Sequence, residues 1–414
     1  MRLGEIEKAM QAGELGRTRQ WAIEQQLRVG RFFDAQDFVE VAQVHIMADT
    51  ESLGASGVEF LEEVARAPEA ERRVRVPTIT DPRGIDFDAY RRLRQTEWMA
   101  DLERRAIDAF RALGVLMTDT CINYQIVMPP VLGQHLAFGD TGSTIYANSV
   151  QGARTNFEGG PSALAAALTG RTPRYGYHLP ERRRATHAFR IEVQPHNWAD
   201  WGALGGLIGR KLQSYWSVPL IEGFEARPTS DQLKHFGAAL ASYGTVALFH
   251  MPGITPEAPT RAAVVDGAGP SPVRVAADDL AAFYKGFDAP GDKLDVVVFS
   301  APQLSLFELE TLAALLDGKR VHPATTMLAI TAPEIRASAV RHGLVQRIEA
   351  SGAIVLGGVC FYQMHAREIG EANGWTRLMS NSAKLVNIIG GYGYKPTLAT
   401  MERCIESAVA GRVL

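Results

Sequence analysis

The chain repeatedly alternates short apolar runs with longer stretches of helical spacing. Residues 39–46 and 74–79 are β-like runs on either side of an amphipathic stretch at 57–65. The alternation returns downstream, where the apolar run 294–299 precedes a helical stretch at 305–316. A strand, a helix and a second strand in this order form a crossover that makes the two strands parallel. The alternation therefore predicts an α/β fold with parallel sheets.

The same order extends through most of the remaining chain. Asp231–Ser242 is a predicted helix, and the apolar run 245–250 behind it is a predicted strand. Ser305 is followed three residues later by Glu308, which is the spacing of a capping box at a helix start. Further predicted elements are helices at 2–27, 86–113 and 333–342, and strands at 325–330 and 352–358.

The length of 414 residues indicates more than one domain, because single hydrophobic cores stop growing near about 250–300 residues. The stretch 252–272 is rich in proline and poor in large apolar residues, so we expect a linker or a long loop there. We place three α/β domains at residues 1–150, 151–270 and 271–414.

Charge and apolar patterning exclude several classes of protein. The formal net charge is −3, whereas a nucleic-acid binder is typically basic, so we expect a small-molecule substrate and no nucleic acid. The chain starts without an apolar signal core, and its most apolar runs, 294–301 and 353–361, are shorter than the ~18 residues of a membrane span. Three cysteines do not form a disulfide framework. We therefore expect a cytoplasmic protein without a membrane segment.

A Gly-rich stretch at residues 148–162 is a candidate anion site. Small flexible residues alternate there with hydrogen-bonding side chains, and Pro161 suits the first turn of a helix. Exposed backbone amides, the helix start and the guanidinium of Arg154 together suit a carboxylate or a phosphate. The alternative is a turn with capping residues and a structural arginine. The chain has neither a P-loop nor a Gly-x-Gly-x-x-Gly motif after a strand.

The three cysteines lie far apart, at Cys121, Cys360 and Cys404, without Cys-x-x-Cys spacing. Isolated cysteines are commonly small buried apolar residues, which is one interpretation here. However, Cys121 follows an apolar segment, and Cys360 ends another. Both could therefore lie at the carboxyl ends of strands, where open α/β sheets bind their ligands.

Other polar residues after apolar segments permit two interpretations. His45 and His250 each end an apolar run, where a histidine serves either a site or a satisfied core contact. The stretch Ser380–Lys384 places a cation after small polar residues, which also fits a helix start on the surface. The histidines form no His-x-x-x-His pair, so a zinc hydrolase is unsupported.

Collinear motifs along nearly the whole chain are similar to those of one enzyme family. They are Gly13–Gly16, Thr120-Cys121, Tyr146–Ser149, Gly152–Asn156, Gly170–Pro173, Leu233–Ala241, Leu248–His250, Gly253–Ala258 and Asn381–Lys384. With these motifs the chain resembles the large subunit of the aconitase X family. The resemblance implies about three α/β domains around a central site, without the swivelling small domain. It also implies a hydro-lyase that contains iron.

Departures from the family pattern bear on the substrate. Ser300-Ala301-Pro302-Gln303 stands where many relatives have Gly-Cys-Pro-His. Asp140-Thr141 and Asp81-Pro82 replace pairs that are usual in the phosphomevalonate branch. The resemblance therefore implies dehydration of cis-3-hydroxy-L-proline to Δ1-pyrroline-2-carboxylate. The alternatives are another small hydroxy acid such as phosphomevalonate, or an inactive paralogue that acts as a scaffold.

The resemblance also implies roles for particular residues. Cys121, Cys360 and Cys404 are the expected iron ligands, because Ala301 replaces a family cysteine. A 2Fe–2S cluster is expected, with a 4Fe–4S cluster or mononuclear iron as alternatives. Lys384 and Arg154 are the expected catalytic residues. Expected substrate-binding residues are Asp49, Asp81, Asp140, Thr141, Asn148, Ser149, Asn156 and Ser382. A small swivelling-domain subunit is expected to supply a catalytic serine.

Overall fold

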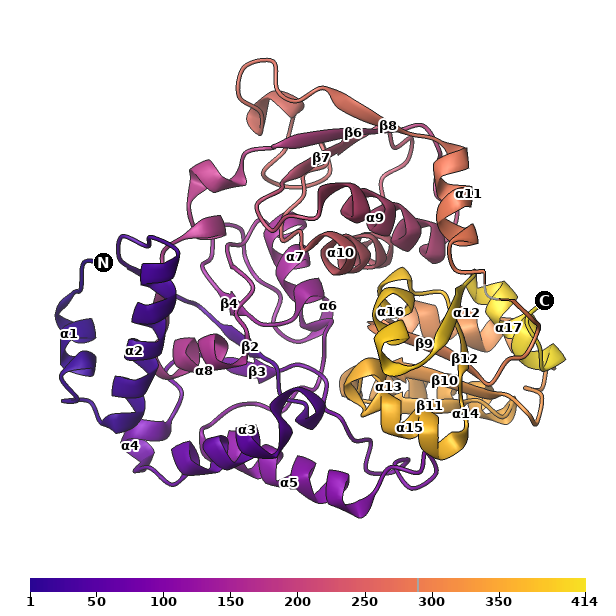
Figure 1. The fold of residues 1–414 in the computed structure, drawn as a ribbon, viewed down its shortest axis with the longest axis horizontal. Coiled ribbons are helices and arrows are strands. Elements are labelled where there is room, and N and C mark those ends of the chain that lie inside the picture. Colours follow the sequence, from indigo (N-terminus) through magenta and orange to yellow (C-terminus); the bar gives the residue numbers. More distant parts are fainter. Residues whose placement is uncertain (289) are drawn as a thin grey trace.

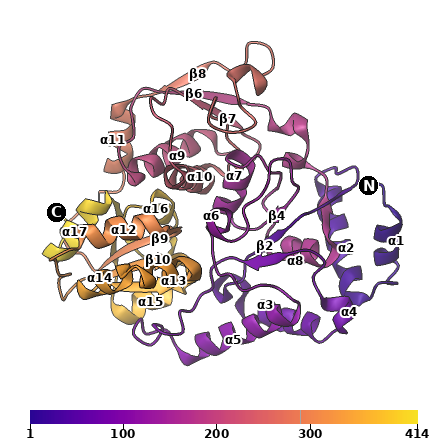
Figure 2. The same cartoon turned by 180° about the vertical axis from the view of Figure 1, so that it is seen from behind.

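Three separate parallel sheets form the cores of three lobes in the computed structural model, which describes residues 1–288 and 290–414. The lobes surround a common centre, as Figure 1 shows. The view from behind in Figure 2 agrees with Figure 1 in placing α6 (Asn123–Ile126) and α7 (Thr141–Ser149) towards this centre. The sequence-based prediction of an α/β fold with parallel sheets is confirmed.

The first lobe contains a three-stranded parallel sheet with the order β3-β2-β4. An antiparallel pair, β1 with β5, lies beside it. The strands are β1 (Phe38–Glu40), β2 (Val44–Ile46), β3 (Thr78–Thr80), β4 (Ala137–Phe138) and β5 (Arg171–Pro173). The helices besides α6 and α7 are α1 (Glu5–Gln11), α2 (Arg17–Phe32), α3 (Thr50–Ala65), α4 (Glu69–Arg72), α5 (Glu97–Ala112) and α8 (Gly160–Thr169).

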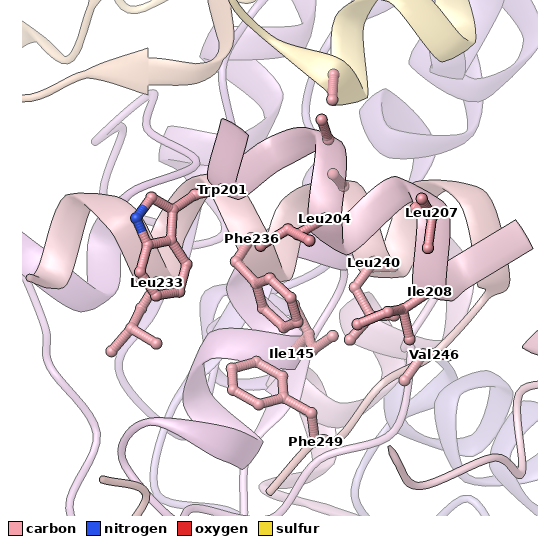
Figure 3. Close-up of a cluster of buried hydrophobic side chains, with 14 of the residues drawn as sticks. Ile145, Trp201, Leu204, Leu207, Ile208, Leu233, Phe236, Leu240, Val246 and Phe249 are labelled. Atoms are coloured by element: carbon pink, nitrogen blue, oxygen red, sulfur yellow. The ribbon is translucent and has the colours of Figure 1, made fainter. Parts of the chain in front are cut away.

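The second lobe combines the sheet β7-β6-β8 with three helices. These elements are β6 (His187–Ile191), α9 (Trp198–Leu212), β7 (Pro219–Glu222), α10 (Ser230–Gly244), β8 (Pro272–Val275) and α11 (Ala277–Lys285). Its core lies between α9, α10 and α7, where Phe236, Leu240 and Ile145 pack together (Figure 3). Gly205 and Gly209 permit this packing, since a Cβ on Gly205 would lie 2.2 Å from the Phe236 carbonyl oxygen.

The third lobe is built on a five-stranded parallel sheet with the order β11-β10-β9-β12-β13. Its strands are β9 (Val296–Leu304), β10 (Thr326–Thr331), β11 (Ile354–Gly357), β12 (Arg377–Ser380) and β13 (Lys395–Leu398). Its helices are α12 (Leu306–Leu315), α13 (Pro333–Arg341), α14 (Leu344–Ala350), α15 (Ala366–Asn373), α16 (Ala383–Ile388) and α17 (Met401–Ala410). The predicted capping box at Ser305 and Glu308 starts α12.

Four local predictions differ from the structure. The predicted β-like run 39–46 is divided between β1 and β2, which belong to separate sheets. The predicted helix 2–27 is divided between α1 and α2, because Gly13 and Gly16 adopt positive φ angles of 80° and 95°. Of the predicted helix 86–113, only the part from Glu97 onward is α5, capped by Thr96. The predicted strand 245–250 is a buried extended segment whose only described ladder contact is one bridge from His250 to Leu220.

Four described elements beyond the predicted domain boundaries, α8, β5, β8 and α11, join the preceding lobe. The helix α8 follows residue 150 but packs on β2, and Pro161 lies in its first turn as predicted. The strand β8 follows residue 270 but pairs with β6. Among the described residues, none of the helices combines the length and the apolar character that crossing a membrane requires.

Candidate active site

Three aspartates of the first lobe lie at the carboxyl edge of its sheet. Asp49 follows β2 and caps α3, where its Oδ1 accepts from the Ser52 amide at 2.7 Å. Asp81 follows β3 directly, and Asp140 follows β4 and caps α7. All three are buried. Because β3, β2 and β4 are parallel neighbours, their carboxyl ends bring the three carboxyl groups to one edge.

The third lobe meets this edge with its own strand ends. Cys360 follows β11 by three residues, and Gln363 ends the short 3-10 helix behind it. Lys384 lies in the first turn of α16, which follows β12. The Gln363 amide donates to Asp81 Oδ2 at 2.8 Å and to Asp49 Oδ2 at 3.1 Å. This contact joins the two lobes.

A buried ion pair lies at the middle of this arrangement. The Lys384 ammonium is 3.1 Å from Asp140 Oδ1, and both side chains are almost completely buried. Burial opposes the charge of Asp140, but Lys384 and His45 outweigh it and hold the pKa of Asp140 below its usual value. Burial also opposes the charge of Lys384, yet Asp140 and the two nearby thiols raise the pKa of Lys384. Both groups are therefore ionised at neutral pH.

The pKa values of the other two carboxyl groups, Asp49 and Asp81, are raised. Burial raises the pKa of Asp49 to about 6. Burial, followed by the charge of Asp140, raises the pKa of Asp81 well above its usual value. The Nε2 of His45 donates to the Thr120 carbonyl at 2.8 Å and lies 3.6 Å from Asp81 Oδ1. The site thus contains Asp81, which holds a proton readily, beside Asp140, which does not.

Several buried polar atoms at this site have no hydrogen-bond partner among the described residues. They are Asp81 Oδ1, Gln363 Oε1, His45 Nδ1, Tyr124 Oη, Asn123 Nδ2 and Asn381 Nδ2. Native proteins leave few such atoms, and each one calls for an explanation. Their concentration at two strand edges that face each other indicates a binding site. We call Asp49, Asp81, Asp140, Cys121, Cys360, Gln363 and Lys384 the central cluster.

Two of the three cysteines belong to the central cluster. Burial raises the pKa of both thiols, and each thiol also responds to Asp81, Asp140 and Lys384. The Cys121 sulfur accepts from the backbone amide of Gln303 at 3.4 Å, and the Cys360 sulfur lies 3.6 Å from Ser300 Oγ. The segment 300–303, which carries Ala301, therefore contacts both thiols.

The structure does not bring Cys404 to this cluster. Cys404 lies on α17 in the core between that helix and the third sheet, and its Sγ is 3.9 Å from the Ala399 carbonyl. Among the described residues, no third Cys, His, Asp or Glu forms a compact metal-ligand group with Cys121 and Cys360. The central cluster therefore offers iron two thiols, those of Cys121 and Cys360, while Cys404 lies in a separate core.

Several side chains of the Gly-rich stretch form hydrogen bonds to neighbouring groups of the protein. The Asn148 amide donates to the carbonyls of Thr155 and Ala247, and its oxygen accepts from Thr155 and Arg183. The Asn156 oxygen accepts from the Tyr177 amide and the Tyr215 hydroxyl, and the Ser149 hydroxyl accepts from the Phe249 amide. These predicted substrate ligands are therefore occupied by structural hydrogen bonds.

Arg154 lies with this stretch and not with the central cluster. Its Nη1 donates to the His178 carbonyl at 3.4 Å, while its Nε is buried without a partner. Ser382 lies beside the central cluster as the cap of α16, where its hydroxyl accepts from the Leu385 amide and donates to the Ala301 carbonyl. Thr141 is half-buried in the first turn of α7.

Gln303 was missed by sequence reasoning and connects the cysteine-bearing segments. Its side-chain amide donates to the carbonyls of Asp119 and Val359, and its Oε1 accepts from the Cys121 amide. Its own carbonyl accepts from the buried Lys234 at 3.1 Å, and Lys234 is paired with Glu308. No local pattern shows this role of Gln303, because its partners lie in three distant segments of the chain. Gln363 was also missed, although its place three residues after Cys360 is a usable signal.

Comparisons with known proteins place this arrangement among related enzymes. Family models described as the first, second and third domains of aconitase X match residues 1–181, 185–285 and 294–410. The phosphomevalonate dehydratase large subunit of Methanothermobacter thermautotrophicus is 35% identical over 94% of each chain. The cis-3-hydroxy-L-proline dehydratase of Pseudomonas aeruginosa is 32% identical over 99% of this chain and 70% of that protein. The crystal structure of the holo-form of Thermococcus kodakaraensis aconitase X matches with a TM-score of 0.87, at 29% identity, over 99% of this chain and 100% of that one.

Proposed function

Since the chain belongs to the aconitase X family and is a hydro-lyase, we propose that it dehydrates cis-3-hydroxy-L-proline to Δ1-pyrroline-2-carboxylate. The predictions of the family and of a dehydratase are confirmed by these matches, whereas the substrate is our proposal. Relatives named for two different substrates have similar identities, so the choice between them depends on the site itself.

The charge of the central cluster is the observation that carries this choice. Among its described residues, three carboxyl groups face a single ammonium group, that of Lys384. Cis-3-hydroxy-L-proline is a zwitterion, so its ring ammonium suits Asp49 and its carboxylate suits Lys384. Phosphomevalonate carries a phosphate and a carboxylate, and these two acidic groups would share one ammonium group that Asp140 already pairs. The cluster therefore favours the amino acid.

The chain's own residues can orient the substrate and move one proton. The Lys384 ammonium neutralises the substrate carboxylate, which lowers the barrier to removing the adjacent α-proton. Asp81, whose Oδ1 has no partner, holds a proton that it donates to the departing hydroxyl group, so that water leaves. Loss of the α-proton and of the hydroxyl group gives the enamine, which tautomerises to the cyclic imine.

The base that takes the α-proton is proposed to be a serine of a separate small subunit. The relatives that this chain covers over 94% to 100% of their length are named large subunit, which supports a small-subunit partner.

Cys121 and Cys360 are proposed to hold an iron centre. Bound iron would act as a Lewis acid towards the hydroxyl group that leaves. Metal binding requires thiolates, and burial disfavours thiolates in the metal-free chain, so iron uptake should release protons. The nuclearity of the centre and a contribution from Cys404 stay predictions.

The proposal is tested by assaying the co-purified two-subunit enzyme with both substrates. We expect a kcat/KM for cis-3-hydroxy-L-proline at least 100-fold above that for phosphomevalonate. Asp49→Asn should raise the KM for the amino acid about 10-fold or more, while Asp108→Asn on the exposed face of α5 serves as the control. Turnover of phosphomevalonate alone would refute the proposed substrate.

Phosphomevalonate is the second candidate, and one observation favours it. The Methanothermobacter large subunit named for that substrate is 35% identical to this chain, compared with 32% for the Pseudomonas enzyme. The two-substrate assay separates the candidates directly.

A further inference from the structure

A second group of candidate metal ligands lies at the seam between the first and third lobes. Glu51 belongs to the first turn of α3, while His365 directly precedes α15 and Glu368 lies in the first turn of α15. Their candidate ligand atoms all lie within 4.8 Å of one another. His365 is buried, Glu51 is half-buried and Glu368 is exposed, so the group opens to solvent on one side.

The hydrogen bonds around His365 determine which of its ring nitrogens is free. Thr50 Oγ1 donates its only proton to the carboxylate oxygen Oε2 of Glu103, at 2.6 Å. The same Thr50 oxygen is 3.2 Å from His365 Nε2, so when Glu103 is ionised Thr50 accepts there and Nε2 carries a proton. In a neutral imidazole the other nitrogen, Nδ1, then has a free lone pair.

This free nitrogen faces an unpartnered oxygen. His365 Nδ1 is 3.4 Å from Glu51 Oε2, a buried atom that has no hydrogen-bond partner within residues 1–288 and 290–414. Two acceptors at this distance repel unless a positive charge lies between them. Two ligands about 2.1 Å from one ion and at a tetrahedral angle are about 3.4 Å apart, so the observed separation suits a shared cation.

We propose that Glu51, His365 and Glu368 bind one divalent cation of the Mn²⁺ or Zn²⁺ class. One imidazole with two carboxylates suits such ions, and solvent completes the coordination on the open side. The path from His365 through Thr50 to Glu103 is the outer hydrogen-bond shell that metal-binding histidines commonly have.

The cation would clamp the two segments that build the central cluster. Glu51 lies two residues after Asp49, and His365 lies two residues after Gln363, whose amide bonds Asp49 at 3.1 Å. A cation between Glu51 and His365 would therefore hold this contact from outside. The clamp uses no thiol and is independent of the proposed iron centre and of the proposed substrate.

The clamp is tested by titrating Mn²⁺ into the full chain after metal removal by a chelator. The Cys121→Ser/Cys360→Ser double variant serves as the parent, so that thiols do not take up the ion. We expect one Mn²⁺ per chain by calorimetry and by electron paramagnetic resonance of the free ion. His365→Ala and Glu368→Gln should each weaken binding at least 10-fold. Glu371→Gln, on the exposed side of the same helix, is the matched control and should bind as the parent does.

Two further measurements address variants that fold poorly and roles that are merely structural. Thr50→Val removes the acceptor that orients His365, and we expect a 10- to 100-fold loss of Mn²⁺ affinity. Saturating Mn²⁺ should raise the thermal unfolding midpoint of the parent, but not that of Glu368→Gln, whose exposed side chain leaves folding intact. Absence of binding at millimolar Mn²⁺, or equal binding by the parent and Glu368→Gln, would overturn the proposal. Either result would leave a proton as the group between Glu51 and His365.

Discussion

The central cluster and the Gly-rich stretch are both dense in buried polar side chains, but they bind different things. Asn148 makes four hydrogen bonds within the protein, two as donor and two as acceptor. In the central cluster, by contrast, Asp81 Oδ1 and Gln363 Oε1 are buried without a hydrogen-bond partner in the part of the chain that the structure describes. A polar side chain is available to a ligand only when the fold leaves its capacity unused. Arg154, with its unpartnered Nε, is an exception in the Gly-rich stretch, as is Gln151 with its unpartnered Oε1.

The largest expected effect comes from Lys384→Met in the two-subunit enzyme. Loss of the only ammonium in the described central cluster should lower kcat/KM at least 10³-fold, which is about 4 kcal/mol. Steady-state kinetics with the preferred substrate measure this, and circular dichroism checks that the fold persists. The exposed Lys395→Met is the control. Activity within 10-fold of wild type would mean that Lys384 has no essential role in catalysis and would contradict the assignment of the central cluster as the active site.

Asn148→Ala should instead act on stability. It leaves buried partners of four hydrogen bonds unsatisfied, so we expect the free energy of unfolding to fall by about 3 kcal/mol. Denaturant unfolding monitored by fluorescence measures the change. At temperatures where the variant is folded, its KM should match the wild-type value. A KM increase of 10-fold or more would indicate that Asn148 binds the substrate.

Glu158, which also lies in the Gly-rich stretch, should make the stability of the chain depend on pH. Burial raises the pKa of Glu158 to about 7, above its ordinary value, so the folded chain favours the protonated form. This stabilisation is complete below about pH 4.5 and is lost as the pH rises through about 7, by roughly 2 kcal/mol between pH 5 and 8. Glu158→Gln keeps an acceptor for the Thr172 hydroxyl and should remove that part of the slope. The free energy of unfolding of the wild type and of Glu158→Gln is measured at pH 5 and at pH 8. An equal change between these pH values in both proteins would contradict the prediction.

Arg154→Lys should have the smallest effect, and it is the sharpest test of the exception. Because Arg154 contacts His178 and not the central cluster, we expect KM and kcat to change less than 3-fold. Kinetics on the purified complex measure both values. A large rise in KM would support the sequence-based expectation that Arg154 binds the substrate carboxylate, and would mean that the unpartnered Nε marks a second part of the site.

The alternation of strands and helices and several helix starts could be predicted from the sequence. The capping box at Ser305 and the first-turn proline of α8 are local patterns, and the structure has both. Such features depend on neighbours within a few residues, which the sequence displays directly. Asp49, Asp81 and Asp140 were expected only from the family resemblance, and the structure places each of them after a short parallel strand.

Which polar residues remain available to a ligand depends on long-range contacts that form only in the folded chain. Asn148 and Asn156 are occupied by groups from Ala247 and Tyr215, far away along the chain, and Cys404 lies in a separate core. Gln303 acquires its role from Lys234 and from carbonyls of distant segments. Hydrogen-bond capacity is used up by whichever partner the fold brings near. The sequence shows the capacity of a side chain, but three-dimensional packing assigns its partner.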